Sequence, residues 1–310
     1  MRISVFFVGE VQDDGFNACA LEGALRAQET GTAEITVIDG VPYDEATIRT
    51  RLTEAASSCD GLVFIGGQGN AATPEVAASF PDTRFAVVQG ARTGPNLASY
   101  DVLQEESAFL AGALAALVTK TGVVGHLSGH RVRPGLKGRA AFVAGVAHVD
   151  PGIAVLTGFC GTQDDNAVSR AWAEAEIEAG ADVIFTMLNA ARQGAIDACR
   201  AGSARQIGNA HDWVAYDPSV FVGSAVARID LGVERAIADM VAERTPSEIV
   251  ELGLAQGDYS RLSLARDVPP ASAGQVEALA RLIRAGEIAI PEAYDGPEFQ
   301  PETGPCAVTG

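Results

Sequence analysis

Strand-sized apolar runs alternate with helix-like segments along most of this chain. Residues 2–9 form a nearly continuous apolar run, rich in β-branched and aromatic residues, that ends at Gly9. Such a run is typical of a strand buried on both faces, as in a parallel sheet covered by helices. This β-α-β-α order implies a parallel sheet with right-handed crossovers. In the first third we expect strands at 2–9, 34–40, 61–67, 85–90 and 96–102, and helices at 16–29, 44–58 and 74–80.

The same alternation begins again after residue 120. A helix at 105–120 leads into a second series, and a chain of 310 residues has room for two domains of ordinary size. Two series of similar size predict an α/β protein with two Rossmann-like lobes. The second series has expected strands at 123–128, 154–161, 182–188 and 206–211, with helices at 136–148, 167–180 and 190–201.

The remaining elements are too few for a third domain, so we expect them to complete the two lobes. We assign residues 1–102 and 222–255 to lobe one, and residues 103–221 and 256–291 to lobe two. Residues 292–310 are rich in Pro, Gly and Glu and are typical of a surface extension. Two independent domains on a flexible linker are the alternative, which the absence of a Pro/Ser-rich linker disfavours.

The charge of the chain disfavours several classes of partner. Forty acidic residues against 22 basic residues give a formal net charge of −18. Such a surface repels phosphate backbones and anionic lipids, so we expect no nucleic-acid partner. The apolar runs are also too short to span a bilayer, so we expect no membrane insertion.

The first expected strand starts at residue 2, without a charged leader or a lipid-attachment cysteine ahead of it. The chain as it stands therefore favours a cytoplasmic location, whereas removal of a leader would imply a periplasmic or cell-surface one. The five cysteines are scattered, odd in number and without a CxxC pair, which modestly favours a reducing compartment.

Polar residues follow several of the expected strands. Because open α/β sheets bind ligands outside the carboxyl ends of their strands, two such lobes predict a ligand cleft at the hinge between them. Asp13 could instead cap the first helix, and Trp213 could instead pack against the hinge. The candidate ligand-binding residues are Asp13, Phe16, Asn17, Gln68, Gln89, His130, Gln163, Asn189, His211, Asp212 and Trp213.

The chain offers little for a cofactor, a metal or catalysis. The glycine-rich segment 66–70 lacks both the Gly-Lys-Ser/Thr of a phosphate loop and the dinucleotide fingerprint. His130, His211, Asp212 and Cys160 have no recognised metal-binding spacing. Ser128 with His130, or Cys160 with His211, would supply a nucleophile and a base, but no nucleophile elbow is present. We therefore expect no cofactor and no metal, and name no catalytic residue.

Three segments of the chain are informative: residues 13–17 (DDGFN), 96–112 (NLASYDVLQEESAFLAG) and 227–230 (ARID). They resemble segments of the basic membrane protein (BMP) family of type I periplasmic binding proteins, and residues 13–17 are similar to its Asp-Lys-Ser-Phe-Asn motif. The resemblance extends to about residue 291. It implies the type I periplasmic binding protein fold and a nucleoside-binding substrate-binding protein of an ABC transporter, with a permease as partner if the protein is exported.

The departures from the family pattern concern the ligand. The two positions where the family has base-stacking rings are Leu21 and Gln163, and Gln89 stands where the family has an acidic residue. A ribose-binding carboxylate and a lysine become Ala210 and Ala227. The resemblance therefore implies a small polar metabolite, either purine-related or another small nitrogenous solute, rather than a nucleoside. A cytosolic enzyme that uses the same cleft is the alternative.

Overall fold

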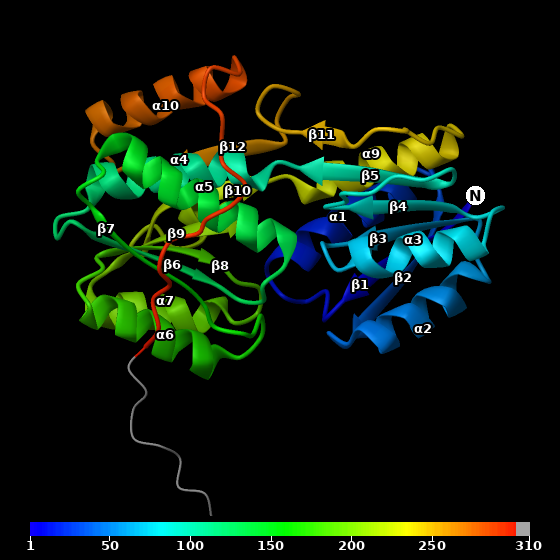
Figure 1. The fold of residues 1–310 in the computed structure, drawn as a ribbon, viewed down its shortest axis with the longest axis horizontal. Coiled ribbons are helices and arrows are strands. Elements are labelled where there is room, and N and C mark those ends of the chain that lie inside the picture. The colour runs from blue at the N-terminus through cyan, green and yellow to red at the C-terminus, as the bar shows by residue number, and fades with distance from the viewer. Residues whose placement is uncertain (302–310) are drawn as a thin grey trace, which may run out of the picture.

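The computed structural model describes residues 1–301, which form two α/β lobes side by side (Figure 1). Each sheet has six strands in this part of the chain, in the orders β11-β5-β4-β3-β1-β2 and β12-β10-β9-β8-β6-β7. All pairs are parallel except the antiparallel pair of β10 and β12. The predicted fold class, two Rossmann-like lobes, is confirmed.

Lobe one carries helices on both faces of its sheet. Along β1, Ile3, Val5 and Phe7 pack in one apolar cluster with α1 and α9, whereas Phe6 and Val8 pack in another with α2 and α3. Successive side chains of a strand point to opposite faces, so a strand covered on both sides is apolar throughout. The elements of lobe one are β1 (Arg2–Val8), α1 (Phe16–Glu29), β2 (Glu34–Val41), α2 (Glu45–Ala56), β3 (Gly61–Ile65), α3 (Gly69–Ser79), β4 (Arg84–Val88), β5 (Leu97–Val102), α9 (Ile229–Val241) and β11 (Val250–Leu252).

Lobe two follows the same plan. Its elements are α4 (Gln104–Val118), β6 (Val123–Ser128), α5 (Arg133–Val149), β7 (Ala154–Phe159), α6 (Asn166–Glu178), β8 (Val183–Met187), α7 (Arg192–Gly202), β9 (Arg205–Ala210), α8 (Trp213–Tyr216), β10 (Phe221–Ala227), β12 (Ser260–Leu264) and α10 (Pro270–Arg284).

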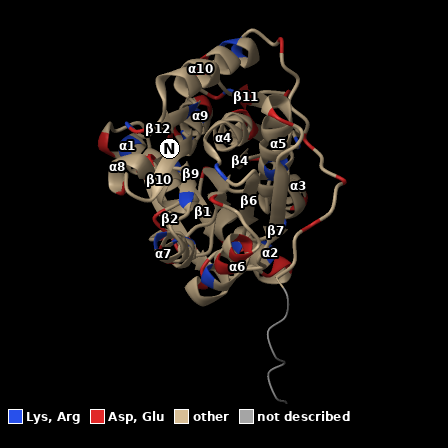
Figure 2. Cartoon of the chain, turned by 90° about the vertical axis from the view of Figure 1, so that its left-hand side faces the viewer, with Lys and Arg blue, Asp and Glu red and all other residues tan. Residues whose placement is uncertain are grey.

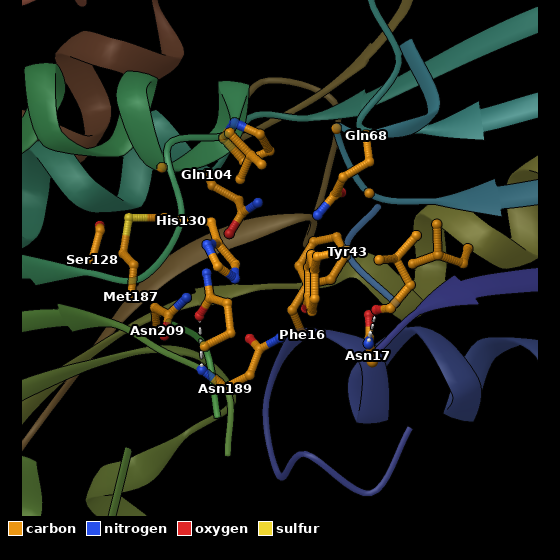
Figure 3. Close-up of a pocket in the computed structure, with 18 residues that line it drawn as sticks. Phe16, Asn17, Tyr43, Gln68, Gln104, Ser128, His130, Met187, Asn189 and Asn209 are labelled. Carbon is orange, nitrogen blue, oxygen red and sulfur yellow. Dashed lines mark hydrogen bonds between the residues drawn. The ribbon is translucent and has the colours of Figure 1, made fainter. Parts of the chain in front are cut away.

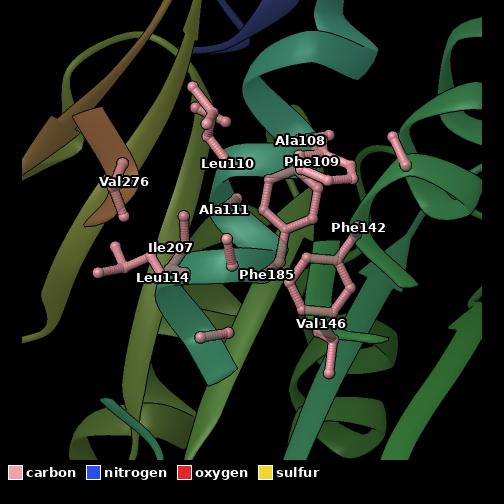
Figure 4. Close-up of a cluster of buried hydrophobic side chains, with 14 of the residues drawn as sticks. Ala108, Phe109, Leu110, Ala111, Leu114, Phe142, Val146, Phe185, Ile207 and Val276 are labelled. Atoms are coloured by element: carbon pink, nitrogen blue, oxygen red, sulfur yellow. The ribbon is translucent and has the colours of Figure 1, made fainter. Parts of the chain in front are cut away.

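The core of lobe two is organised around the contact between α4 and α5. A methyl group added at Gly112 would lie 2.0 Å from the Phe142 carbonyl oxygen, and one at Gly145 would lie 2.0 Å from that of Phe109. Glycine at both positions therefore lets the two helix backbones approach closely. Phe142 stacks on Phe185 of β8 at 5.2 Å between ring centroids, which joins the helices to the sheet (Figure 4).

The chain passes between the lobes at three places in the described residues: from β5 to α4, from β10 to α9, and from β11 to β12. This corrects the expected boundary at residue 222, because β10 pairs with β9 and β12 in the second sheet. Only α9 and β11 return to lobe one. The sequence could not distinguish the two assignments, since every residue of β10 is buried and would suit either sheet.

The first part of the expected surface extension, residues 292–301, runs over the outside of lobe two (Figure 1). Its Phe299 N–H donates to the Thr157 carbonyl oxygen of β7 at 2.8 Å. Residues 302–310 lie outside the described residues. Within residues 1–301, no helix has both the length and the apolar character needed to cross a membrane.

Candidate functional site

A small pocket of about 60 Å³ lies where the carboxyl ends of the strands of both sheets meet (Figure 3). This placement follows from the topology, because parallel strands end at the same edge of their sheet and the two edges face each other across the hinge. Lobe one lines the pocket with Val8, Phe16, Asn17, Tyr43, Ile65, Gly66, Gly67 and Gln68. Lobe two lines it with Gln104, Ser128, His130, Val132, Pro134, Gly135, Gln163, Met187, Asn189 and Asn209.

Several of these amide side chains are held in place by bonds to the protein itself. Asn17 Nδ2 donates to the carbonyl oxygens of Val8 at 2.9 Å and Glu10 at 3.0 Å, which fixes the loop between β1 and α1. Gln163 Oε1 accepts the Asn189 N–H at 3.2 Å, so these two lining residues hold each other. The amide donors and acceptors that these bonds leave free can form hydrogen bonds with a ligand.

Gln104 differs from the other amides. It is 5% exposed, and its Nε2 is buried without a hydrogen-bond partner among the described residues. It stands at the first position of α4, just after the chain passes from lobe one to lobe two, and its side chain projects into the pocket (Figure 3). A buried donor without a partner costs about 1–3 kcal/mol, a cost that a ligand acceptor would remove.

Rings from the two lobes meet at one side of the pocket. Tyr43 follows β2 in lobe one and His130 follows β6 in lobe two, and their ring centroids lie 4.7 Å apart at an angle of 45°. Phe16, at the start of α1, adds a third ring to the wall. Burial raises the pKa of the Tyr43 hydroxyl, so this ring is uncharged.

Close contacts and ion pairs hold the lobes together around this pocket. A methyl group added at Gly15 of lobe one would lie 3.1 Å from the Asn189 Cα of lobe two. Next to the hinge, Asp101 of β5 pairs with Arg133 at 2.7 Å and with Lys137 at 3.1 Å, both on α5. The lobes are therefore closed on each other.

The structure brings six of the eleven predicted residues together in the pocket. They are Phe16, Asn17, Gln68, His130, Gln163 and Asn189. A separate groove of about 390 Å³, between α1 and helices α7 and α8, is lined by Asp13, His211, Asp212 and Trp213, and also by Asn189. Gln89 lines neither opening.

The Asp13 side chain forms its hydrogen bonds with backbone groups of its own loop. Its carboxylate accepts the N–H groups of Gly15 at 2.9 Å, Asn17 at 3.1 Å and Ala18 at 2.9 Å, as in the capping alternative. Burial raises the pKa of Asp13, against the three N–H donors and the charge of Arg192 in lobe two. Its contribution to the pocket is thus to hold Phe16 and Asn17 in place.

Gln89 was expected to contact the ligand, but its side chain is used inside lobe one. Its Nε2 donates to the Val102 carbonyl oxygen at 3.2 Å, and its Oε1 accepts the Val102 N–H at 3.1 Å. Both ends of the amide therefore extend the pairing between β4 and β5. Buried polar side chains frequently satisfy backbone groups of neighbouring strands, and the Gln89 amide does so here.

His211, Asp212 and Trp213 are also displaced from the pocket. Trp213 donates from Nε1 to the Asn209 carbonyl oxygen at 3.0 Å, and its ring carries the Arg192 guanidinium 4.4 Å from the ring centroid. Arg192 in turn donates to Asn209 Oδ1 at 2.7 Å. Burial lowers the pKa of Arg192 to about 9, although the charges of Asp13 and Asp14 oppose this. Trp213 and Arg192 therefore hold the backbone and the side chain of Asn209, which lines the pocket.

Ser128 is the one candidate nucleophile from the sequence that lines the pocket. Its Oγ lies 2.9 Å from Nε2 of His126, not His130, and His126 Nδ1 lies 2.9 Å from Thr157 Oγ1. Burial lowers the pKa of His126 to about 3. An imidazole with so low a pKa is a poor general base at neutral pH. In the described residues, no cluster of three His, Cys, Asp or Glu side chains could hold a metal ion.

The two-lobed fold with a pocket between the strand ends agrees with the comparison to known families. A sequence model of the family described as "ABC transporter substrate-binding protein PnrA-like" (Bmp) matches residues 1–259. The chain belongs to this family. It is a substrate-binding protein, and its function is to bind a small metabolite.

Individual relatives agree with the family assignment. Basic membrane protein A2 of Borrelia garinii subsp. bavariensis is 23% identical over 310 residues, covering 95% of this chain and 90% of the relative. A purine-binding protein of Brucella abortus is 25% identical over 229 residues, covering 73% and 65%. The fold is that of an ABC transporter solute-binding protein from Aeropyrum pernix K1, with a TM-score of 0.85, 24% identity, and coverage of 95% and 94%.

The sequence analysis missed several lining residues. Tyr43 lies in a loop between β2 and α2, and Met187 at the end of β8 reads as an ordinary core residue. Gln104 was part of the family-like segment 96–112, but it stands at a helix start and not at a strand end. Ser128 ends β6 and Asn209 stands one residue before the end of β9; both are buried polar residues, and the sequence indicated Ser128 only as a possible nucleophile.

Proposed function

We propose that the protein captures one small, uncharged, nitrogen-rich metabolite in the pocket between its lobes. The observation that carries this proposal is the character of the lining. Six lining residues are amides, and no Asp, Glu, Lys or Arg lines the pocket among the described residues. Amides offer both donors and acceptors, whereas a charge placed there would lose its hydration without a counter-charge.

A flat heterocycle suits this lining best. The Phe16 ring lines the pocket, where a planar ring system can pack against it, and planar amides can pair with the edge of such a ring. The lining contains no carboxylate to grip the vicinal hydroxyls of a ribose, and the pocket is small. We therefore favour a free nucleobase or a similar heterocycle, and the purine-binding relative supports a purine-related compound.

The family assignment supports transport as the purpose of binding. In an ABC transporter, the substrate-binding protein carries its solute to a membrane permease. We propose that this protein closes on its solute and passes it to such a permease at the outer face of the membrane. The enzyme alternative has no supporting observation, because the histidine bonded to Ser128 is too weak a base.

Isothermal titration calorimetry with matched compounds tests the proposal. The panel comprises hypoxanthine, adenine, guanine and uracil, the corresponding nucleosides, and the nucleoside monophosphates. We expect at least one free base to bind with a Kd in the micromolar range or below, to bind more tightly than its nucleoside, and to raise Tm. The monophosphates should give no heat. A monophosphate that binds as tightly as its base would refute the proposal.

A further inference from the structure

We propose that Glu298, close to the end of the described chain, is a positioning residue for the binding pocket. Glu298 fixes the position of Arg131, and Arg131 in turn keeps the neighbouring His130 in contact with Tyr43 of lobe one. This inference rests on the proposed function, since it concerns the same pocket. It adds a part of the chain, residues 285–301, that lies beyond the family match to residues 1–259.

Residues 285–301 leave α10 and run as an extended segment along α5 toward β7, on the outside of lobe two (Figure 2). We call this segment the C-terminal strap. Ile288 and Ile290 pack against the apolar core of lobe two, and Glu292 pairs with Lys137 of α5 at 3.1 Å. The contacts of the strap end at Phe299, which bonds to Thr157 of β7 and meets Trp172 edge-on at 6.5 Å between ring centroids. The strap is thus attached to lobe two at both ends.

Glu298 lies between these attachments and binds two arginines. Its Oε1 accepts from Arg131 Nη1 at 2.9 Å and its Oε2 accepts from Arg131 Nη2, so this pair is bidentate. Oε1 also accepts from Arg139 Nη1 of α5. Bidentate pairs of arginine and carboxylate fix direction as well as distance. The two arginines lower the pKa of Glu298 to about 2, so it is charged at any physiological pH.

Arg131 belongs to the loop that forms one wall of the pocket. His130 on one side of it contacts Tyr43 of lobe one, and Val132 on the other side lines the pocket. The Arg131 guanidinium lies over the Phe159 ring, 4.7 Å from its centroid. The other guanidinium bound by Glu298, that of Arg139, lies 5.0 Å from the same ring centroid.

Because Arg139 is buried, its guanidinium needs the Glu298 carboxylate as a counter-charge. The Arg139 side chain is 6% exposed, and Glu298 is the acidic partner that the described residues provide for it. Replacement of Glu298 by glutamine would leave a buried guanidinium without a counter-charge and would release the bidentate hold on Arg131. We therefore expect the loop 129–132 to become mobile while the two sheets keep their packing.

The experiment compares Glu298→Gln with Glu287→Gln in ligand-free protein. Glu287 lies on the same strap and is exposed, and its side chain makes no hydrogen bond or ion pair with the described residues. Hydrogen exchange of residues 129–132 should quicken at least about threefold in Glu298→Gln and stay unchanged in Glu287→Gln. The imidazole NMR signal of His130, assigned with His130→Asn, should shift as its contact with Tyr43 loosens, while that of His148 stays in place.

A double-mutant cycle with Arg131→Gln separates positioning from general destabilisation. The double variant should exchange no faster at 129–132 than either single variant. Unchanged exchange at 129–132, or exchange that quickens equally throughout lobe two, would overturn the proposal. With hypoxanthine as the probe, Kd should rise about 3- to 10-fold in Glu298→Gln and stay unchanged in Glu287→Gln. If the wild-type protein binds none of the four free bases, the ligand class is wrong, and the exchange result still decides the role of Glu298.

Discussion

Gly67 in lobe one lies directly against Pro134 in lobe two. A methyl group added at Gly67 would lie 2.9 Å from Cδ of Pro134, closer than carbon atoms normally approach. Both residues line the pocket, so this contact marks how closely the lobes approach around a ligand. Any side chain larger than that of glycine at position 67 would therefore limit how far the two lobes can close.

Gly67→Ala should hold the lobes apart. The added methyl group clashes with Pro134 in the closed form only, so we expect Kd for a bound heterocycle to rise at least about tenfold, or about 1.4 kcal/mol, and the protein in solution to be more open than wild type. Calorimetry and small-angle X-ray scattering measure the two effects. Gly274→Ala on α10 is the matched control, because an added methyl group there meets open space. Equal binding by Gly67→Ala and wild type would contradict this role.

Gln104→Leu should change stability and binding in opposite directions. Leucine removes the buried Nε2 that lacks a partner, so the ligand-free protein should be as stable as wild type or more so. Loss of the donor should weaken ligand binding by about 1–2 kcal/mol, or about 5- to 30-fold. Thermal unfolding and calorimetry check the two signs. A variant that binds as tightly as wild type would show that Gln104 does not contact the ligand.

Gln89→Ala should affect stability alone. The substitution removes both side-chain bonds to Val102, and we expect a loss of about 1–3 kcal/mol in the free energy of unfolding. Because Gln89 lies outside the pocket, Kd should stay within about twofold of wild type. Urea unfolding and calorimetry provide the two measurements. A large rise in Kd with unchanged stability would restore the original prediction that Gln89 contacts the ligand.

Glu176 should make stability depend on pH. Its carboxyl is fully buried on α6, and both oxygens lack partners among the described residues, so burial raises its pKa well above the ordinary value. The folded state keeps a proton that the unfolded state releases above about pH 4.5, so this contribution to stability is complete below that pH and is lost as pH rises toward the folded pKa.

Urea unfolding between pH 5 and 8 measures this dependence. The free energy of unfolding of wild type should fall as pH rises, relative to Glu176→Gln, with a slope of at most about 1.4 kcal/mol per pH unit. Glu178→Gln on the same helix, at an exposed position, should behave like wild type. Parallel pH profiles for wild type and Glu176→Gln would show that Glu176 is ionised in the folded protein.

The fold was predictable because its signals are local. Strands such as β1 are apolar on both faces wherever they sit, and helices such as α6 follow at regular intervals. The membership of β10 was not predictable, because a fully buried strand carries no mark of the sheet that it joins. That information lies in its pairing with β9, a contact between strands that the local pattern does not encode.

The site was predictable in part for a similar reason. Polar residues after strands predicted a pocket at these edges of the two sheets, and Phe16, Asn17 and Gln163 do line one pocket there. Whether a polar side chain faces a ligand or satisfies backbone groups depends on its bonds in three dimensions. Asp13 and Gln89 satisfy backbone groups, whereas Gln104 keeps its donor free.

A crystal structure of the protein with the tightest-binding compound of the calorimetric panel tests the central claim most directly. We predict density for the heterocycle inside the pocket, with one ring face against Phe16 and an acceptor within hydrogen-bond distance of Gln104 Nε2. Density in the groove beside His211 and Trp213, with the pocket empty, would contradict the account.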